Sequence, residues 1–147
     1  MRRSDLDLLD PGFRAKLEAV VADLEAAGSP LRVYETIRAP SRQKELFARG
    51  RDPEAADFGR TATKATAYES LHQWGHAADL VGHVNGSWTW NLASGYWLAL
   101  ATAAKRHGLE TLSFEKPHVQ TPDFRGHGKI GPMDDAGWLE WLKTRVA

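Results

Sequence analysis

The chain has 147 residues, no net charge at neutral pH and no cysteine. This length suits one compact domain spanning residues 1–147, and 42% hydrophobic residues are enough to form a core. The neutral charge balance argues against nucleic-acid partners, because surfaces that neutralise phosphates are usually basic. The absence of cysteine excludes disulfides, thiolate ligands and thiol nucleophiles, so any metal must be bound by histidine or carboxylate side chains.

The N-terminus does not resemble an export signal. The segment from Met1 to Asp5 contains two arginines followed by an acid, with no apolar segment and no small-residue cleavage site. No apolar run approaches the roughly 20 residues that cross a bilayer. We therefore expect cytoplasmic synthesis and no membrane partner, with action at the cell wall only if another process, such as lysis, releases the protein.

The first third of the chain predicts a helix, a strand and a second helix. Asp10 followed by Pro11 is typical of a helix start, because the aspartate caps the first turn and proline fits its first position. Residues 31–37 are rich in branched and aromatic side chains, which favours a strand. The second helix, over 40–50, is expected to direct Phe47 inward.

The middle of the chain combines a long loop with a short strand. Residues 51–69 show little periodicity and are expected to form a loop, which at this length is often functional. Residues 77–81 are apolar and predict a central strand, and 82–91 a turn or hairpin. A third helix is expected over 94–106, with Tyr96 on its inward face.

The last part of the chain predicts short strands and a final helix. Strands are expected at 112–114 and 118–120, and a glycine- and proline-rich loop over 121–133. Asp134 is placed to cap the last helix, whose apolar side chains recur at helical spacing. The order of elements indicates an α+β domain in which a small sheet is flanked by helices.

Two short stretches carry the residue types of a metal site. Between His72 and Asp79 lie small residues that let the backbone turn from a loop into a strand, and His118 follows farther along the chain. Asp79 lies inside the apolar run Ala77–Val81, where a carboxylate is costly to bury unless it is paired or binds a metal. Two imidazoles and one carboxylate are an ordinary catalytic zinc set that leaves a fourth position for water. The alternative is three unrelated polar residues with structural hydrogen bonds.

Glu115 is the candidate general base. It lies three residues before His118, with Pro117 between them, so that one residue can bind the metal while the other reaches the attacking water. The alternative role is a surface carboxylate or an ion pair with Lys116 or Arg125.

The two stretches together resemble the M15 zinc peptidases, which include D-alanyl-D-alanine carboxypeptidases and L-alanyl-D-glutamate endopeptidases. The pattern Ser-x-His-x-x-Gly-x-Ala-x-Asp is followed downstream by Glu-x-x-His. Its defined positions are Ser70, His72, Gly75, Ala77 and Asp79, followed by Glu115 and His118. The segment 33–40, with its arginine, and the glutamine that follows are similar to the family's upstream strand.

The resemblance implies a fold, a cofactor and roles for single residues. It implies a small, mainly antiparallel sheet flanked by helices, of the hedgehog and D-Ala-D-Ala-peptidase type, holding one zinc ion. Arg38 would stabilise the developing oxyanion, for which its fixed charge is suited. Ser70 and Gln43 would be substrate-binding residues. The alternatives are a structural ion pair of Arg38 with Glu35 or Glu45, a turn cap for Ser70, and a supporting role for Gln43.

The expected activity is hydrolysis of an amide bond in peptidoglycan stem peptides or a D-Ala-D-Ala-type peptide, by an enzyme that acts as a monomer. It would be an endopeptidase or a D,D-carboxypeptidase, either an endolysin of a phage or a cytoplasmic dipeptidase. Trp88 and Trp90 are candidates to line the substrate groove. Two other classes stay open: a non-catalytic zinc-binding module of the same fold, which binds a cell-wall or partner ligand, and a structural phage component that binds glycan.

Overall fold

The computed structural model describes residues 1–51, 53, 59, 63, 70–112, 115–122, 131 and 133–146, with Glu115 described only in its backbone. Most of the predicted loops 51–69 and 121–133, and part of the predicted strand 112–114, therefore lie outside the described residues. Within the described part, no helix combines the length and the apolar character needed to cross a bilayer. The elements in chain order are α1 (Pro11–Ala26), β1 (Leu31–Glu35), α2 (Pro40–Ala48), the 3-10 helix η1 (Leu71–Trp74), β2 (Ala77–Val84), β3 (Ser87–Thr89), α3 (Ser94–Arg106), β4 (Glu110–Leu112), β5 (Glu115–Gln120) and α4 (Asp135–Val146).

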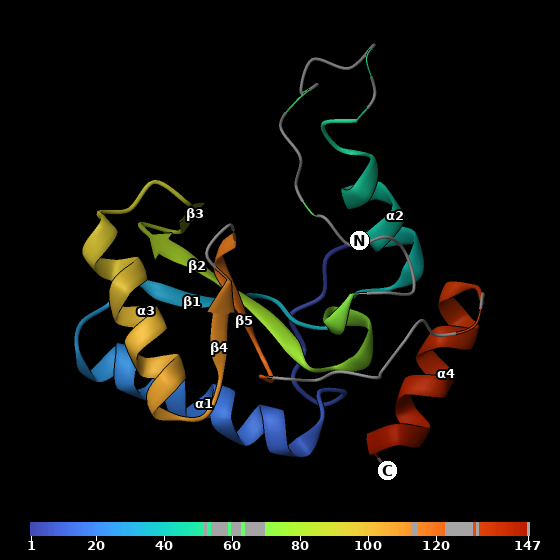
Figure 1. Ribbon diagram of the computed structural model, residues 1–147, viewed down its shortest axis with the longest axis horizontal. Helices are drawn as coiled ribbons and strands as arrows, with labels where there is room; N and C mark the ends of the chain where they lie inside the picture. Colours follow the sequence, from blue (N-terminus) through green and yellow to red (C-terminus); the bar gives the residue numbers. More distant parts are fainter. Residues whose placement is uncertain are drawn as a thin grey trace.

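The strands form one antiparallel sheet, as the sequence predicted. Its order is β1-β2-β5-β4, and β3 pairs with β2 outside this path. Helices α1 and α3 pack together at one end of the molecule, and α2 and α4 contact each other at the other end (Figure 1). The α+β class with a small antiparallel sheet flanked by helices is confirmed.

The local signals at the start of α1 and in the β2–β3 hairpin explain why these elements form. The Asp10 carboxylate accepts a hydrogen bond from the Phe13 backbone N–H at 3.0 Å, so the predicted helix cap is confirmed. The hairpin turns at Asn85 and Gly86, whose φ angles are 52° and 78°. Positive φ at both central residues is the signature of a type I′ turn, which matches the twist of paired strands.

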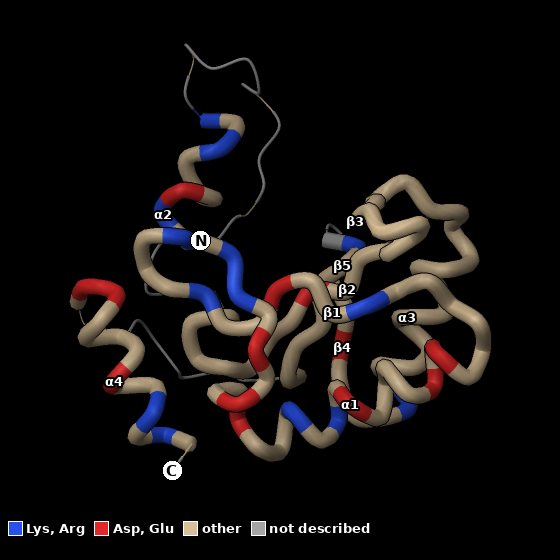
Figure 2. Tube along the Cα trace, turned by 180° about the vertical axis from the view of Figure 1, so that it is seen from behind, with Lys and Arg blue, Asp and Glu red and all other residues tan. Residues whose placement is uncertain are grey.

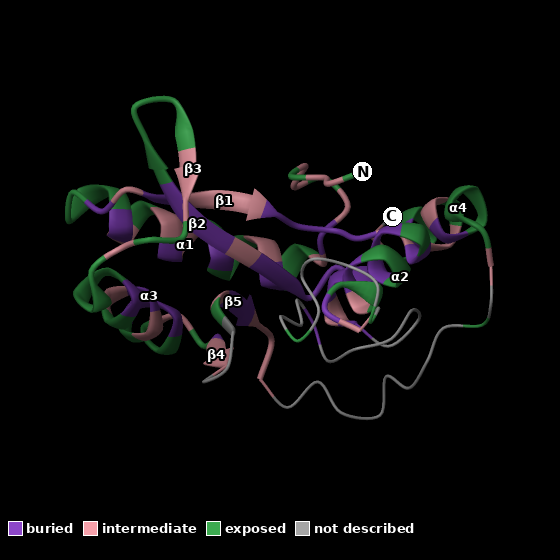
Figure 3. Ribbon diagram, turned by 90° about the horizontal axis from the view of Figure 1, so that it is seen from above, coloured by how far each residue is buried: buried purple, intermediate pink, exposed green. Residues whose placement is uncertain are grey.

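The core lies between α1, the sheet and α3, and most of β2 is buried in it (Figure 3). One prediction about an inward-facing side chain is wrong, and a second is met only in part. Tyr96 is 41% exposed, because Trp97 and Leu100 supply the buried face of α3 and thereby direct the preceding residue to solvent. Phe47 is only half-buried, and the Arg51 guanidinium covers its ring at 3.8 Å.

Gly75 makes the tight turn between η1 and β2 possible. Its φ is 73°, and a Cβ atom there would lie 3.0 Å from the Leu8 carbonyl oxygen and 3.1 Å from the Asp10 backbone nitrogen. We expect Gly75→Ala to lower the free energy of unfolding by about 2 to 4 kcal/mol, because left-handed backbone and overpacking against backbone atoms both cost energy. Urea denaturation measures this loss.

Gly28 offers a matched control for this prediction. It has a similar φ of 77°, but nothing lies within 4 Å of a Cβ atom built on it. Gly28→Ala should therefore cost only the conformational part, about 1 to 2 kcal/mol. Equal losses in the two variants would contradict the close approach of residues 8–10 to the turn.

Candidate metal centre

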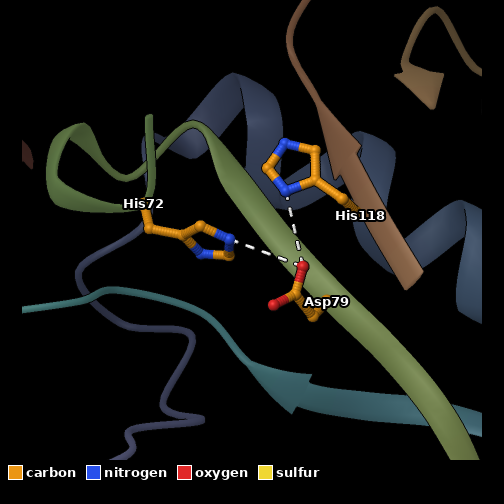
Figure 4. A group of neighbouring side chains, drawn as sticks. All are labelled: His72, Asp79 and His118. Carbon is orange, nitrogen blue, oxygen red and sulfur yellow. Dashed lines mark ion pairs between the residues drawn. The ribbon is translucent and has the colours of Figure 1, made fainter. Parts of the chain in front are cut away.

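Three side chains from separate elements converge at one point. His72 comes from η1, Asp79 from β2 and His118 from β5, and all three point toward one another (Figure 4). The sheet register pairs Asp79 with His118, while the hydrogen bond from the Arg38 backbone N–H to the His72 carbonyl brings η1 beside the end of β1. One potential ligand atom of each residue lies within 4.8 Å of the others. Among the described residues, this group could hold a metal ion.

The hydrogen bonds of His72 determine which of its nitrogens faces the centre. Nδ1 lies 2.7 Å from the Thr36 backbone oxygen, which can only accept, so Nδ1 carries the proton. Burial lowers the pKa of His72, and the nearby Arg38 charge lowers it further, so the ring is neutral. Nε2 therefore directs a lone pair at Asp79 Oδ1, 3.5 Å away. This buried nitrogen has no hydrogen-bond partner among the described residues.

His118 is oriented in the same way by a relay across two strands. Gln120 donates through Nε2 to the Glu110 carboxylate at 2.7 Å, which leaves its carbonyl oxygen facing His118. His118 Nε2 lies 2.8 Å from this oxygen and must donate to it. In the neutral ring Nδ1 then carries the lone pair, and it lies 3.4 Å from Asp79 Oδ1.

Asp79 completes a cluster of three acceptors. Arg38 Nη2 lies 3.3 Å from Asp79 Oδ2, and this cation favours the ionised carboxylate. A carboxylate oxygen and two imidazole lone pairs that converge without a shared proton repel one another unless a cation lies between them. The donor set, and the partners that orient both rings, therefore fit a metal ion, and two nitrogens with one oxygen suit zinc.

Arg38 lies beside the cluster, held by its own buried partners. One of its guanidinium nitrogens, Nη2, lies 2.8 Å from Glu35 Oε1 and 3.3 Å from Asp79 Oδ2. The other, Nη1, donates to the carbonyl oxygen of Gln43 at 2.9 Å. The ion pair with Glu35, considered from the sequence as an alternative role, is thus present. It orients Arg38 toward Asp79.

Several solved structures with a similar fold are peptidases. The chain matches an L,D-carboxypeptidase, DacB from Streptococcus pneumoniae, at 19% identity and a TM-score of 0.57, over 92% of this chain and 72% of that one. It matches the LD-carboxypeptidase LdcB, whose structure is described for its recognition of peptidoglycan, at 17% identity and a TM-score of 0.58, over 92% and 71%. It matches the L-Ala D-Glu endopeptidase ChiX from Serratia marcescens at 24% identity and a TM-score of 0.50, over 81% and 86%. The chain has the fold of these peptidases. No family model and no curated protein sequence matches it.

A cleft opens beside the centre of this peptidase fold. Its volume is about 400 Å³, and Asp79 and Arg38 both line it. Trp90, predicted as a groove residue, lines it too and is 50% exposed, with its ring 4.9 Å from that of Tyr34. Trp88 instead packs against Tyr34 and His83 in the hairpin.

The other predicted site residues are placed as follows. Ser70 caps η1, since its hydroxyl accepts a hydrogen bond from the His72 backbone N–H at 3.2 Å. The O–H of this hydroxyl is not used by the cap. Gln43 is fully buried and reaches the site through Arg38. The backbone of Glu115 begins β5, but its side chain lies outside the described residues, as does Arg125.

Sequence reasoning missed the residues that orient the ligands. The sequence could have indicated Gln120, because residues two apart in a strand share a face, which places Gln120 beside His118. No feature of the sequence indicates the Thr36 carbonyl as the partner of His72, since every residue has a backbone carbonyl. The sequence suggests Glu35 only as a partner of Arg38, yet its second oxygen also accepts from Arg42 Nε at 3.0 Å.

Glu35 is expected to stabilise the fold only while it is ionised. Burial raises the pKa of Glu35, but the Arg38 charge outweighs this and leaves the pKa below its usual value. A lowered folded-state pKa stabilises the protein above the unfolded value, about 4.3, and this contribution is lost as the pH falls through the folded value. We expect Glu35→Gln to lower the free energy of unfolding by about 3 kcal/mol near neutral pH, because two buried arginines lose their partner.

Urea denaturation at about pH 7 and about pH 3 measures this effect, and the difference between wild type and variant should shrink at the lower pH. Glu45→Gln is the control, since Glu45 pairs with Arg42 and Arg49 at the surface and should contribute at most about 1 kcal/mol. A difference for Glu35→Gln that is independent of pH would contradict the ionised pair.

Proposed function

We propose that this chain is a zinc peptidase of the M15 type that hydrolyses an amide bond in peptidoglycan stem peptides. The observation that carries the proposal is the convergence of His72 Nε2 and His118 Nδ1 on the Asp79 carboxylate, beside a cleft that Arg38 lines. The fold shared with two L,D-carboxypeptidases and an L-Ala D-Glu endopeptidase supports the choice of substrate. His72, Asp79 and His118 would hold one zinc ion.

Each residue of the site has a chemical role in this proposal. Zinc would act as a Lewis acid and make water a competent nucleophile near neutral pH. Glu115 accepts the proton of the attacking water on its carboxylate and passes it to the leaving amine. Arg38 stabilises the negative charge that develops on the scissile carbonyl oxygen, in the orientation that Glu35 and Gln43 give it.

Two further residues act on the substrate in this scheme. Ser70 contacts the bound peptide from the N-terminal end of η1, directly before His72. Gln43 acts on the substrate only indirectly, by holding Arg38 in place, because its own side chain is fully buried. Trp90 supplies an exposed aromatic wall for the bound peptide.

Digestion of purified peptidoglycan by the zinc-loaded protein tests the proposal, with the products identified by mass spectrometry. We expect cleavage that a chelator abolishes and added zinc restores. Release of a single terminal amino acid would indicate a carboxypeptidase, and two peptide fragments would indicate an endopeptidase. Stoichiometric zinc without cleavage of either peptidoglycan or soluble stem peptides would refute the peptidase and favour the non-catalytic zinc-binding module.

A further inference from the structure

Positive charge predominates among the described residues that line the cleft. Four cationic side chains face two carboxylates there: Arg38, Arg42, Arg49 and Lys116 against Glu35 and Asp79. Arginine and lysine also recur along α2, which borders the cleft (Figure 2). The cleft therefore favours an anionic ligand, because like-signed charges lining a concave surface reinforce one another.

The two inner arginines, Arg38 and Arg42, share a carboxylate partner within the protein. Glu35 accepts from Arg38 through one oxygen at 2.8 Å and from Arg42 through the other at 3.0 Å. All three side chains are buried or nearly so. This buried network fixes Arg38 at the position proposed for the oxyanion, so a second anionic group of the substrate would meet the two outer cations.

Lys116 and Arg49 are the outer cations. Lys116 is exposed, lies two residues before His118 on β5, and makes no ion pair within the part of the chain that the structure describes. Arg49 follows α2 and binds Glu45 at 3.0 Å through Nη2, but both side chains are about half exposed, so this pair is weak. An arginine also has five N–H donors, and one contact leaves most of them available.

We propose that Lys116 and Arg49 form an anion subsite that recognises a carboxylate of the substrate peptide near the scissile bond. This inference rests on the proposed function and adds two residues, Lys116 and Arg49, that would set the specificity of the cleft. Arginine can bind a carboxylate through two parallel hydrogen bonds, while lysine supplies a point charge. The carboxylate would be either the C-terminal one or one on a neighbouring residue.

A set of amidated peptides distinguishes these two sources. The parent is a soluble stem peptide that contains L-Ala–D-Glu, compared with one version amidated at its C-terminus and one amidated at the glutamate. The measured quantity is kcat/KM for each peptide. We expect the wild type to prefer the parent over one of the two amides by roughly tenfold to a hundredfold, the range for one hydrogen bond to a charged group.

The variants assign this preference to the subsite. Lys116→Met and Arg49→Gln should each lower kcat/KM for the parent by roughly tenfold and leave the disfavoured amide unchanged, so that the preference collapses. Lys116→Arg, which keeps the charge, should retain most of the preference. Lys143→Met is the control, because Lys143 is an exposed cation on α4 that pairs with Glu140, and it should retain wild-type values.

Two results would overturn the subsite. The first is an equal loss on all three peptides, which would indicate a structural role beside Glu115. The second is an unchanged preference in both Lys116→Met and Arg49→Gln.

A failure of the proposed function is distinguishable from a failure of the subsite. If the wild type cleaves none of the peptides, calorimetric titration of the same peptides into the zinc-loaded protein tests the subsite directly. Tighter binding of the parent than of one amide, lost in Lys116→Met, would support the subsite without peptidase activity. Equal binding of all peptides would overturn it.

Discussion

Asp79→Asn is expected to abolish stoichiometric zinc binding and, with it, peptide hydrolysis. The substitution keeps the shape of the side chain but removes the charge on which the lone pairs of His72 and His118 converge. Loss of an outer partner of a metal ligand typically weakens metal affinity by 10- to 100-fold, so loss of a ligand should exceed about a hundredfold. Competition with a chromogenic chelator measures the affinity, and elemental analysis measures the zinc content.

Asp7→Asn is the control for this prediction, because Asp7 is an exposed carboxylate in a weak pair with Arg14. It should bind zinc with wild-type affinity. His118→Ala should reproduce the loss of zinc and of activity from the other side of the centre. Wild-type zinc affinity in Asp79→Asn would remove Asp79 from the ligand set and with it the basis for the proposed peptidase.

Glu115→Gln is expected to keep zinc and lose nearly all turnover. The amide has nearly the size of the carboxylate but cannot accept a proton from water, and general-base catalysis typically contributes about 10²- to 10⁴-fold. The zinc content should stay stoichiometric, because the three proposed ligands are unchanged. Steady-state kinetics on a soluble stem peptide, together with elemental analysis, separates the two quantities.

The control for this variant is Glu140→Gln, an exposed carboxylate on α4 whose removal should change neither zinc content nor kcat. An active Glu115→Gln enzyme would refute the assigned base. Loss of zinc together with activity would instead place Glu115 among the ligands or show that it supports them.

Local features determined much of the fold. The Asp10 cap, the branched residues of β1 and the turn at Asn85 and Gly86 act over a few neighbouring residues, so their effects can be predicted without knowledge of the rest of the chain. The side chains of α3 that face the core are harder to predict from the sequence. The residues that face the sheet depend on where the helix docks, and Trp97, rather than Tyr96, fills that position.

The candidate ligands were also accessible from the sequence, for a physical reason. A carboxylate within an apolar strand is too costly to bury without a partner, which singles out Asp79, and the absence of cysteine limits the remaining ligands to histidine and carboxylates. The order of these residues along the chain, together with Glu115, carries the resemblance to M15 peptidases.

The tertiary structure decided how these residues meet. The pairing of Asp79 with His118 is set by the register of β2 against β5, which depends on the whole sheet. The tautomer of His72 depends on the Thr36 carbonyl, which is distant in the sequence. The tautomer of His118 depends on Gln120, which is oriented by Glu110 on the neighbouring strand. Composition and spacing thus determined which groups are available for chemistry, whereas non-local packing alone determined the direction in which each lone pair and each charge points.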